Sequence, residues 1–286
     1  MAIARPVARR RLLGVAARWG MRLTCAGMLA AGYATAIEPQ WVEVTTQRMR
    51  LREPAPAFAG YRIAQISDLH MGDWLDRAHL ADVVRRVSAL GADLIAITGD
   101  FVTRHPERVA DELIAELRGL RARDGVVAVL GNHDHWSDAG IVREILRSSG
   151  VRELRNRAIT LERGGMALHI AGVDDYWERQ DRLDDVVAAL PRGGAAVLLA
   201  HEPDYADVST ATGRFDLQIS GHSHGGQIVL PGHGPIRLPP YGRKYPLGRY
   251  TVGGMTLYTN RGVGMLRPHV RINCRPEITL FELEAG

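Results

Sequence analysis

Between Tyr61 and Ser148 the sequence alternates three short apolar runs with three stretches of helical periodicity, and this alternation constrains the fold more than any other feature. The apolar runs span residues 61–66, 94–98 and 126–130, which is the length of buried strands. The stretches that follow them carry apolar residues at a 3.6-residue period. Such alternation predicts right-handed βαβ units and a largely parallel sheet, and therefore an α/β fold.

The second half of the chain is richer in strands. A chain of 286 residues with 46% hydrophobic content is long and apolar enough to form the core of one large domain or of two small ones. The two cysteines, Cys25 and Cys274, lie too far apart in the sequence to suggest a bridge and exclude a cysteine-based metal site. Further strands are expected at residues 41–45, 166–173, 196–200, 217–220, 227–230, 255–259 and 278–282, with a helix near 183–190.

Side chains of the metal-ligand type follow the expected strands at the point where each strand ends. The carboxyl ends of parallel strands are where open α/β sheets place their ligand sites. Carboxylates, imidazoles and one amide without a thiolate suit a divalent ion such as Mn, Fe or Zn. Seven candidates over-supply one ion, so two ions sharing a bridging carboxylate fit better, and such pairs serve phosphoryl displacement. The candidates are Asp68, His70, Asp100, Asn132, His201, His222 and His224.

These motifs, taken in order, resemble the calcineurin-like metallophosphoesterase superfamily. The pattern consists of Asp68-x-His70, Gly99-Asp100, Gly131-Asn132-His133-Asp134, His201 and Gly221-His222-Ser223-His224. Neighbouring segments, including Ile37-Glu38-Pro39, His201-Glu202-Pro203-Asp204 and Pro240-Tyr241-Gly242, resemble its membrane-associated or twin-arginine-exported bacterial phosphodiesterase branch.

The resemblance implies a four-layer α-β-β-α sandwich with a dinuclear metal site at the strand carboxyl ends. By resemblance, one metal would take Asp68, His70 and His224, the other would take Asn132, His201 and His222, and Asp100 would bridge them. His133 would act as an acid or charge stabiliser on the phosphate, and Asp134 would orient it. The nucleophile would be hydroxide bound between the two metals.

The expected activity is hydrolysis of phosphodiester or pyrophosphate bonds in a phosphorylated small molecule or a lipid-linked substrate. Alternatives are a phosphomonoesterase, an enzyme similar to the UDP-2,3-diacylglucosamine pyrophosphatases of lipid A synthesis, and a non-catalytic metal-binding scaffold. Trp136 and Trp177 are expected at the rim of the site. Candidate substrate contacts are His135, Tyr241, Arg243 and Lys244.

Residues 1–37 form a separate N-terminal segment with six arginines and no acid. Removing these six charges from the net +4 leaves about −2, so no nucleic-acid partner is indicated. The apolar stretch 23–37 is short for a membrane span, which needs about 20 residues. Arg9-Arg10-Arg11 followed by Ala34-Thr35-Ala36 suggests a cleavable twin-arginine export signal.

An uncleaved signal anchor, an amphipathic surface anchor and an ordinary buried helix remain open as alternatives for this segment. We expect membrane association at the inner membrane through residues 1–37, with export of the body as the variant in which the segment crosses. Residues 38–286 are then expected to form the metallophosphoesterase catalytic domain.

Overall fold

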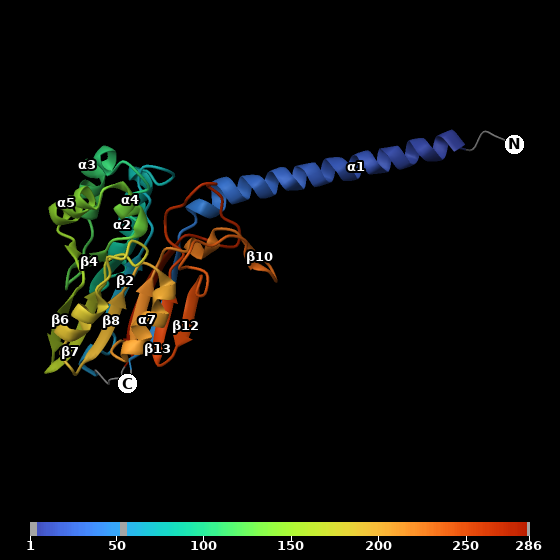
Figure 1. Ribbon diagram of the computed structural model, residues 1–286. Helices are drawn as coiled ribbons and strands as arrows, with labels where there is room; N and C mark the ends of the chain where they lie inside the picture. Colours follow the sequence, from blue (N-terminus) through green and yellow to red (C-terminus); the bar gives the residue numbers. More distant parts are fainter. Residues whose placement is uncertain (1–4, 52–55, 285–286) are drawn as a thin grey trace.

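The protein is described by a computed structural model over residues 5–51 and 56–284, with side chains from residue 18 onward. Two six-stranded sheets lie face to face, and helices cover the outer face of each sheet (Figure 1). The expected four-layer α-β-β-α sandwich is therefore confirmed.

The first sheet has the strand order β1-β14-β2-β3-β4-β5, in which only β14 and β2 pair antiparallel. Its strands are β1 (Glu43–Arg50), β2 (Arg62–Ile66), β3 (Leu94–Thr98), β4 (Val126–Val129), β5 (Arg152–Glu153) and β14 (Glu277–Glu284).

The second sheet has the order β12-β13-β9-β8-β7-β6, with antiparallel pairs only at its two edges. Its strands are β6 (Arg157–Arg163), β7 (Met166–Gly172), β8 (Ala195–Leu199), β9 (Leu217–Ser220), β12 (Gly248–Val252) and β13 (Met255–Thr259). A small hairpin, β10 (Val229–Leu230) with β11 (Gly234–Pro235), stands apart from both sheets.

Helices surround the sheets and join their strands. The α-helices are α1 (Arg5–Gly32), α2 (Arg77–Ala89), α3 (Pro106–Leu117), α4 (Asn132–Ser137), α5 (Ala139–Ser149), α6 (Leu183–Ala189) and α7 (Ala206–Ser209). A π-helical turn covers Tyr33–Ile37, and 3₁₀ turns cover Glu38–Gln40, Pro56–Phe58, Pro203–Tyr205, Thr210–Thr212 and His224–Gly226.

Alternation along the strands builds the layers, because successive side chains point to opposite faces of a sheet. In β2, Ile63 packs between the sheets while Ala64 packs under the outer helices. In β3, Leu94 and Ile95 divide in the same way. With both faces covered, the central strands are apolar throughout and bring their carboxyl ends to one edge.

The expected strand at 227–230 is confirmed only in part, since Val229–Leu230 is a strand, Ile228 forms an isolated bridge to Ile272, and Gln227 is not extended. The backbone at Gly225, Gly226 and Gln227 has positive φ, which breaks a strand. The edge strands β6 and β12 were not expected from the sequence.

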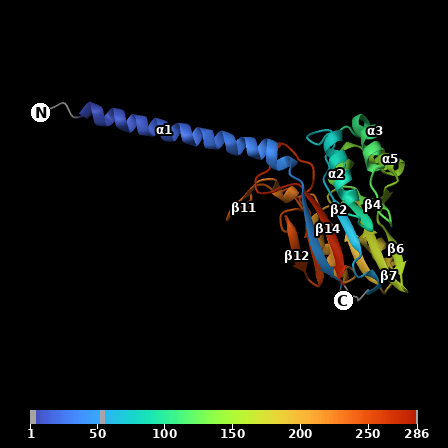
Figure 2. The same ribbon diagram turned by 180° about the vertical axis from the view of Figure 1, so that it is seen from behind.

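Helix α1 projects away from the body as an isolated helix (Figure 2). Residues 18–33 are solvent-exposed, so the interpretation of this stretch as a buried helix is wrong. The side chains of the twin-arginine motif, Arg9-Arg10-Arg11, lie outside the described residues. Among residues 5–51 and 56–284, no helix is both long and apolar enough to cross a membrane.

At its root, α1 is joined to the body by main-chain and side-chain hydrogen bonds. The Arg271 amide donates to the Ala34 carbonyl at 3.0 Å. The Cys274 amide donates to Oε1 of Glu38 at 2.7 Å. Ala34 and Glu38 are both buried, so the root is packed into the body although the helix beyond it is not.

Candidate metal centre

All seven candidate ligands follow the carboxyl ends of β2, β3, β4, β8 and β9. Five lie in loops, whereas Asn132 begins α4 and His224 begins a 3₁₀ turn. Most of them fall into groups whose nitrogen or oxygen atoms lie within 4.8 Å of one another. Each of the seven side chains is buried. The groups of mutually close atoms are Asp68, His70 and His224; Asp100, His201 and His222; and His70, Asp100 and His133.

Five of the seven candidates have left-handed backbone conformations that non-glycine residues rarely adopt. Each such residue costs on the order of 1–3 kcal/mol, and these conformations persist mainly at functional sites. Gly99, with φ +93°, is required beside them because a Cβ there would lie 2.6 Å from Nδ1 of His201. The five residues are Asp68, His70, Asp100, His222 and His224.

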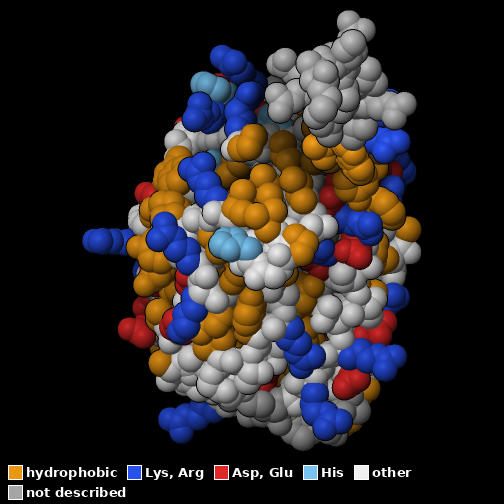
Figure 3. Space-filling view, turned by 90° about the vertical axis from the view of Figure 1, so that its right-hand side faces the viewer, with side chains coloured by type: hydrophobic (Ala, Val, Ile, Leu, Met, Phe, Trp, Pro, Cys, Tyr) orange, Lys and Arg blue, Asp and Glu red, His pale blue; other side chains and the backbone are white. Residues whose placement is uncertain are grey.

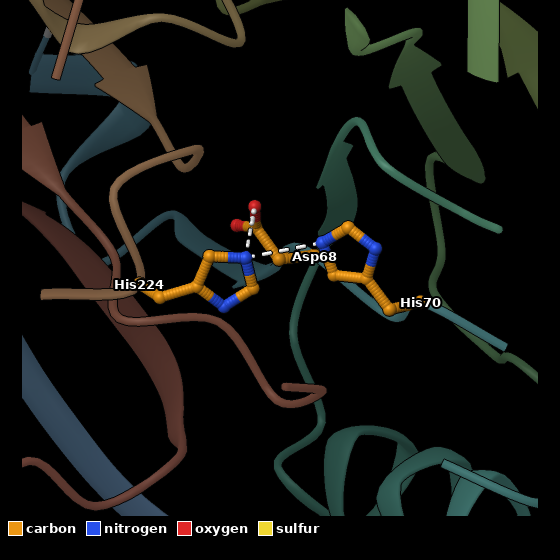
Figure 4. Close-up of side chains that lie close together, drawn as sticks. All are labelled: Asp68, His70 and His224. Atoms are coloured by element: carbon orange, nitrogen blue, oxygen red, sulfur yellow. Dashed lines mark hydrogen bonds and ion pairs between the residues drawn. The ribbon is translucent and has the colours of Figure 1, made fainter. Parts of the chain in front are cut away.

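Asp68, His70 and His224 form one half of the cluster, called here the Asp68 half (Figure 4). Nε2 of His70 lies 3.0 Å from Nε2 of His224, which in turn lies 3.5 Å from Oδ1 of Asp68. The other ring nitrogen of His70 lies 3.2 Å from the Thr103 hydroxyl. The Nε2 atoms of both rings therefore face the space beside the Asp68 carboxylate.

Asn132, His201 and His222 form the other half, called the Asn132 half. Nδ1 of His201 donates to the Thr98 carbonyl at 2.7 Å, and Nε2 of His222 donates to the Pro240 carbonyl at 2.8 Å. A ring nitrogen that donates in this way fixes the orientation of the ring, so the opposite nitrogen is turned away from the main chain. These opposite nitrogens lie 3.2 Å apart and face the site.

Asp100 lies between the two halves. Its Oδ2 is 3.4 Å from Nε2 of His70 and 3.3 Å from Nε2 of His201, and its Oδ1 accepts the His133 amide at 2.9 Å. Burial opposes charge on Asp100 and His201, but their mutual attraction lowers the pKa of the carboxyl well below its usual range and raises that of the imidazole. One carboxylate oxygen thus faces both halves, as a bridging ligand requires.

The donor set fits two divalent cations. Oδ1 of Asn132 is buried and has no hydrogen-bond partner among the described residues. Burial lowers the pKa of His70 to about 3 and that of His224 well below its usual value, so both imidazoles are neutral. Neutral imidazoles, carboxylates and an unpaired amide oxygen are the ligands that borderline divalent ions take.

His133 lies beside the cluster at the start of α4, with its ring centroid 4.8 Å from that of His70. The Asp134 carboxylate accepts amide hydrogens from Phe101, Val102 and Gly131, at 2.8, 3.2 and 3.0 Å. It therefore joins the loops after β3 and β4 and acts on the position of His133 through the main chain.

The candidate substrate contacts lie in different surroundings. Nε2 of His135 bonds Oδ1 of Asp174 at 2.8 Å, and Nζ of Lys244 bonds both Asp207 oxygens at 2.7 and 2.8 Å. Tyr241 is partly exposed and packs against Trp177. Arg243 borders a cavity that opens from the cluster.

Two cavities meet at His133 and Trp136. The larger, about 540 Å³, also borders Asp100, Asn132 and Trp177 and is called here the apolar chamber. The smaller, about 430 Å³, is lined mainly by residues with polar or charged side chains and is called here the polar pocket. Its other lining residues are Thr103, Arg104, His105 and Ser137. Trp136 and Trp177 thus lie at the rim of the site, as expected.

Sequence reasoning missed the supports of the cluster. Thr103, which bonds His70, follows β3 by five residues and has no distinguishing motif. Arg271 is fully buried and donates to the carbonyls of Arg261, Gly262, Gly264 and Cys274. An isolated arginine in a C-terminal loop gives no sequence signal for such a role.

Comparison with known proteins shows that the chain is similar to phosphoesterases. Residues 61–226 match the family model described as calcineurin-like phosphoesterase. The chain is 35% identical to the uncharacterized metallophosphoesterase YkuE of Bacillus subtilis, over 91% of this chain and 93% of that protein. It is 30% identical to the phosphodiesterase YaeI of Escherichia coli, over 97% and 99%. It is 27% identical to the UDP-2,3-diacylglucosamine pyrophosphatase LpxG of Chlamydia trachomatis, over 91% and 94%.

Proposed function

Because this chain belongs to the calcineurin-like phosphoesterase family, we propose that it hydrolyses phosphodiester or pyrophosphate bonds. It is a hydrolase, and its family uses two divalent metal ions. The observation that carries the proposal is the Asp100 oxygen that lies within 3.4 Å of an imidazole from each half.

The two halves supply the proposed ligand set. The Asp68 half would hold one ion, the Asn132 half would hold the other, and Asp100 would be shared. When bound, such ions polarise phosphoryl oxygens and lower the pKa of bound water. The choice among Mn, Fe and Zn depends on the geometry of the site and on metal availability as well as on the ligand types, because raw affinity alone does not select the metal.

His133 is proposed to donate a hydrogen bond or a proton to the leaving oxygen. It lies beside both cavities and is half-buried, so it can reach a phosphoryl group held at the cluster. A positioned imidazole contributes to proton transfer near neutral pH. Asp134 keeps the start of α4, and with it His133, against the loop after β3.

The two cavities favour a diester or pyrophosphate over a monoester. A diester carries a group on each side of the reacting phosphorus, and the apolar chamber and the polar pocket both border His133, which lies beside the cluster. A monoester would fill only one of them. Substrate binding by Tyr241 and Arg243 remains part of this proposal, as does binding by His135 and Lys244.

The experiment is turnover of bis(4-nitrophenyl) phosphate and 4-nitrophenyl phosphate by the full chain with Mn²⁺, Fe²⁺ or Zn²⁺. We expect the diester to be hydrolysed with the higher kcat/KM. Absence of turnover with every ion would contradict the activity. Faster hydrolysis of the monoester would identify a phosphomonoesterase, and metal binding without any turnover would identify a scaffold.

Membrane association through residues 1–37 is proposed separately, with residues 38–286 as the catalytic domain. Its support is the exposed helix α1, on which Leu23, Met28 and Leu29 are at least 62% exposed. Cell fractionation and N-terminal sequencing of the expressed protein would test it. A protein found only in the cytosolic fraction would contradict membrane association, and a mature N-terminus near residue 37 would show an export signal.

A further inference from the structure

The apolar chamber opens directly from the metal centre. Its inner end is formed by Asp100, Asn132 and His222. Farther out its walls consist mainly of aliphatic side chains and prolines, including Ile228, Ile236, Leu238, Pro239, Leu266 and Pro268. A cavity of about 540 Å³ is within the range of small-molecule sites.

The polar side chains of these walls are already engaged by the main chain. The Gln227 amide group donates to the carbonyls of Leu266 and Pro268 at 3.0 and 3.1 Å, and its oxygen accepts the Leu266 amide at 2.7 Å. The Ser223 hydroxyl donates to the Pro246 carbonyl at 2.5 Å. A sugar or base in this space would lose its hydration without gaining partners, which is costly.

Charge around the chamber is positive at its mouth. Arg237, Arg243 and Arg267 border it and are exposed, with Arg267 paired to Asp73 at 3.2 Å, whereas Asp100 is the only carboxylate among its described lining residues. Guanidinium groups suit phosphate oxygens. The chamber therefore favours anionic groups of a ligand at its inner end and at its mouth, and apolar groups between these two ends.

The mouth lies on the side of the body from which α1 projects. Residues 266–268 form part of the chamber wall. Three residues farther along the chain, the Arg271 amide donates to the Ala34 carbonyl at the root of α1 at 3.0 Å. Leu230 and Ile236, at the β10–β11 hairpin, are 42% and 51% exposed. Figure 3 views this side and shows hydrophobic side chains gathered across it, with Lys and Arg around them.

We propose that the apolar chamber holds an acyl chain, and that the substrate is a phosphorylated amphiphile whose phosphoester lies at the metal centre. This inference rests on the proposed function for the reaction itself. The chain enters from the side that carries Leu230, Ile236 and α1, which is the side that would face a bilayer if α1 lies in or on one. The polar pocket then takes the hydrophilic part of the substrate.

The test compares two ligands that differ only in chain length. Binding of octylphosphonate and methylphosphonate to the Mn²⁺-loaded full chain is measured by calorimetry, below the micellar concentration of the longer ligand. We expect octylphosphonate to bind at least about tenfold more tightly, because each buried methylene favours binding. Equal affinities would overturn the proposal, whether or not the protein turns over any ester.

Two variants locate the effect. Ile236→Asp changes an exposed chamber residue and should reduce the octyl-to-methyl affinity ratio toward one, and Leu266→Ser should reduce it by a smaller factor. Val208→Asp, at an exposed apolar position on α7, should leave the ratio unchanged. An unchanged ratio in Ile236→Asp would overturn the proposal. So would tight binding of uridine monophosphate that Ile236→Asp weakens, because it would make the chamber a nucleoside site.

Failure of the proposed function gives a different result. Hydrolysis of methyl 4-nitrophenyl phosphate tests the reaction without using the chamber, and hydrolysis of octyl 4-nitrophenyl phosphate tests both. If both esters are hydrolysed with equal kcat/KM, the reaction stands and the acyl site does not. If neither is hydrolysed but octylphosphonate binds preferentially, the acyl site stands and the reaction does not.

Discussion

The two halves of the metal centre are supported differently. In the Asn132 half both imidazoles donate to main-chain carbonyls, those of Thr98 and Pro240. In the Asp68 half His70 contacts the Thr103 side chain, and Nδ1 of His224 has no hydrogen-bond partner among the described residues. Main-chain acceptors are fixed by the fold, whereas a side-chain support can be lost by one substitution. We therefore expect the metal of the Asp68 half to exchange more readily.

The largest effect should come from Asp100→Asn, because Asp100 is the residue proposed to bind both metal ions. Activity on bis(4-nitrophenyl) phosphate should fall by about 10³-fold or more, because the charge stabilisation that metals supply is worth several kcal/mol. Metal content, measured by mass spectrometry, should fall below one ion per chain. The surface variant Asp82→Asn is the control. Retention of two ions and of activity within tenfold would show that Asp100 does not bridge the halves.

His133→Gln should reduce kcat by about 10²-fold, the lower end of the range for general acid catalysis, since 4-nitrophenoxide is a good leaving group. The loss should be larger with diphenyl phosphate, whose leaving group needs its proton more. Both ions should remain bound, because His133 is outside the two halves. Loss of a metal together with the activity would instead make His133 a ligand.

Thr103→Val tests the difference between the halves directly. It removes the support of His70, and losing such an outer partner costs about 10–100-fold in metal affinity. Titration with a chelator should release one ion early and the other at the wild-type concentration. Ser137→Ala is a matched control, because its hydroxyl bonds the Thr103 carbonyl rather than His70. Equal weakening of both ions would contradict the independence of the halves.

The smallest effect should come from Glu277, which supports the Asp68 half from a distance. Its carboxylate accepts hydrogen bonds from Thr45, Tyr258 and Arg261, and the segment after Arg261 bonds the main chain of Asp68. Glu277→Gln should lower the free energy of unfolding by about 1–3 kcal/mol, as expected for a buried charged hydrogen bond.

Glu277 should also make the free energy of unfolding decrease at acid pH. Burial opposes ionisation of Glu277, but the Arg261 guanidinium and the two hydroxyls hold its pKa below its usual value. Its stabilisation is therefore present above the unfolded pKa and is lost as the pH falls through the lower folded pKa. Denaturant unfolding between pH 3 and 7 should show this slope, and Glu277→Gln should reduce it. The control Glu162→Gln, at an exposed position, should leave the slope unchanged. An unchanged slope in Glu277→Gln would contradict the stabilising role assigned to Glu277.

The sequence allowed the layers and the cluster to be predicted because both follow from local patterns. Buried strands are recognisable from their apolar runs, and β3, β9 and β13 have the predicted bounds. The polar residue after each run then falls at the same sheet edge by topology alone. No tertiary contact needs to be known for either step.

The apolar chamber could not be predicted in this way. Its walls come from residues 226–240 and 266–268, which are joined by the side chain of Gln227 across about forty positions of sequence. The left-handed conformations of His70 and His222 likewise could not be predicted from the sequence, because histidine is not among the residues that dominate turns. The edge strands β6 and β12 were not predicted because one face of each strand is polar, so neither forms a continuous apolar run.

The root of α1 gives the helix a mechanical role. The chain passes from α1 through a π-helical turn and a 3₁₀ turn into β1 without an intervening Gly/Ser linker, and Ala34 and Glu38 hold that passage against residues 271–274. We therefore expect α1 and the body to move together, because no flexible linker separates them. A surface that bound α1 would therefore set the angle at which the body is presented to it.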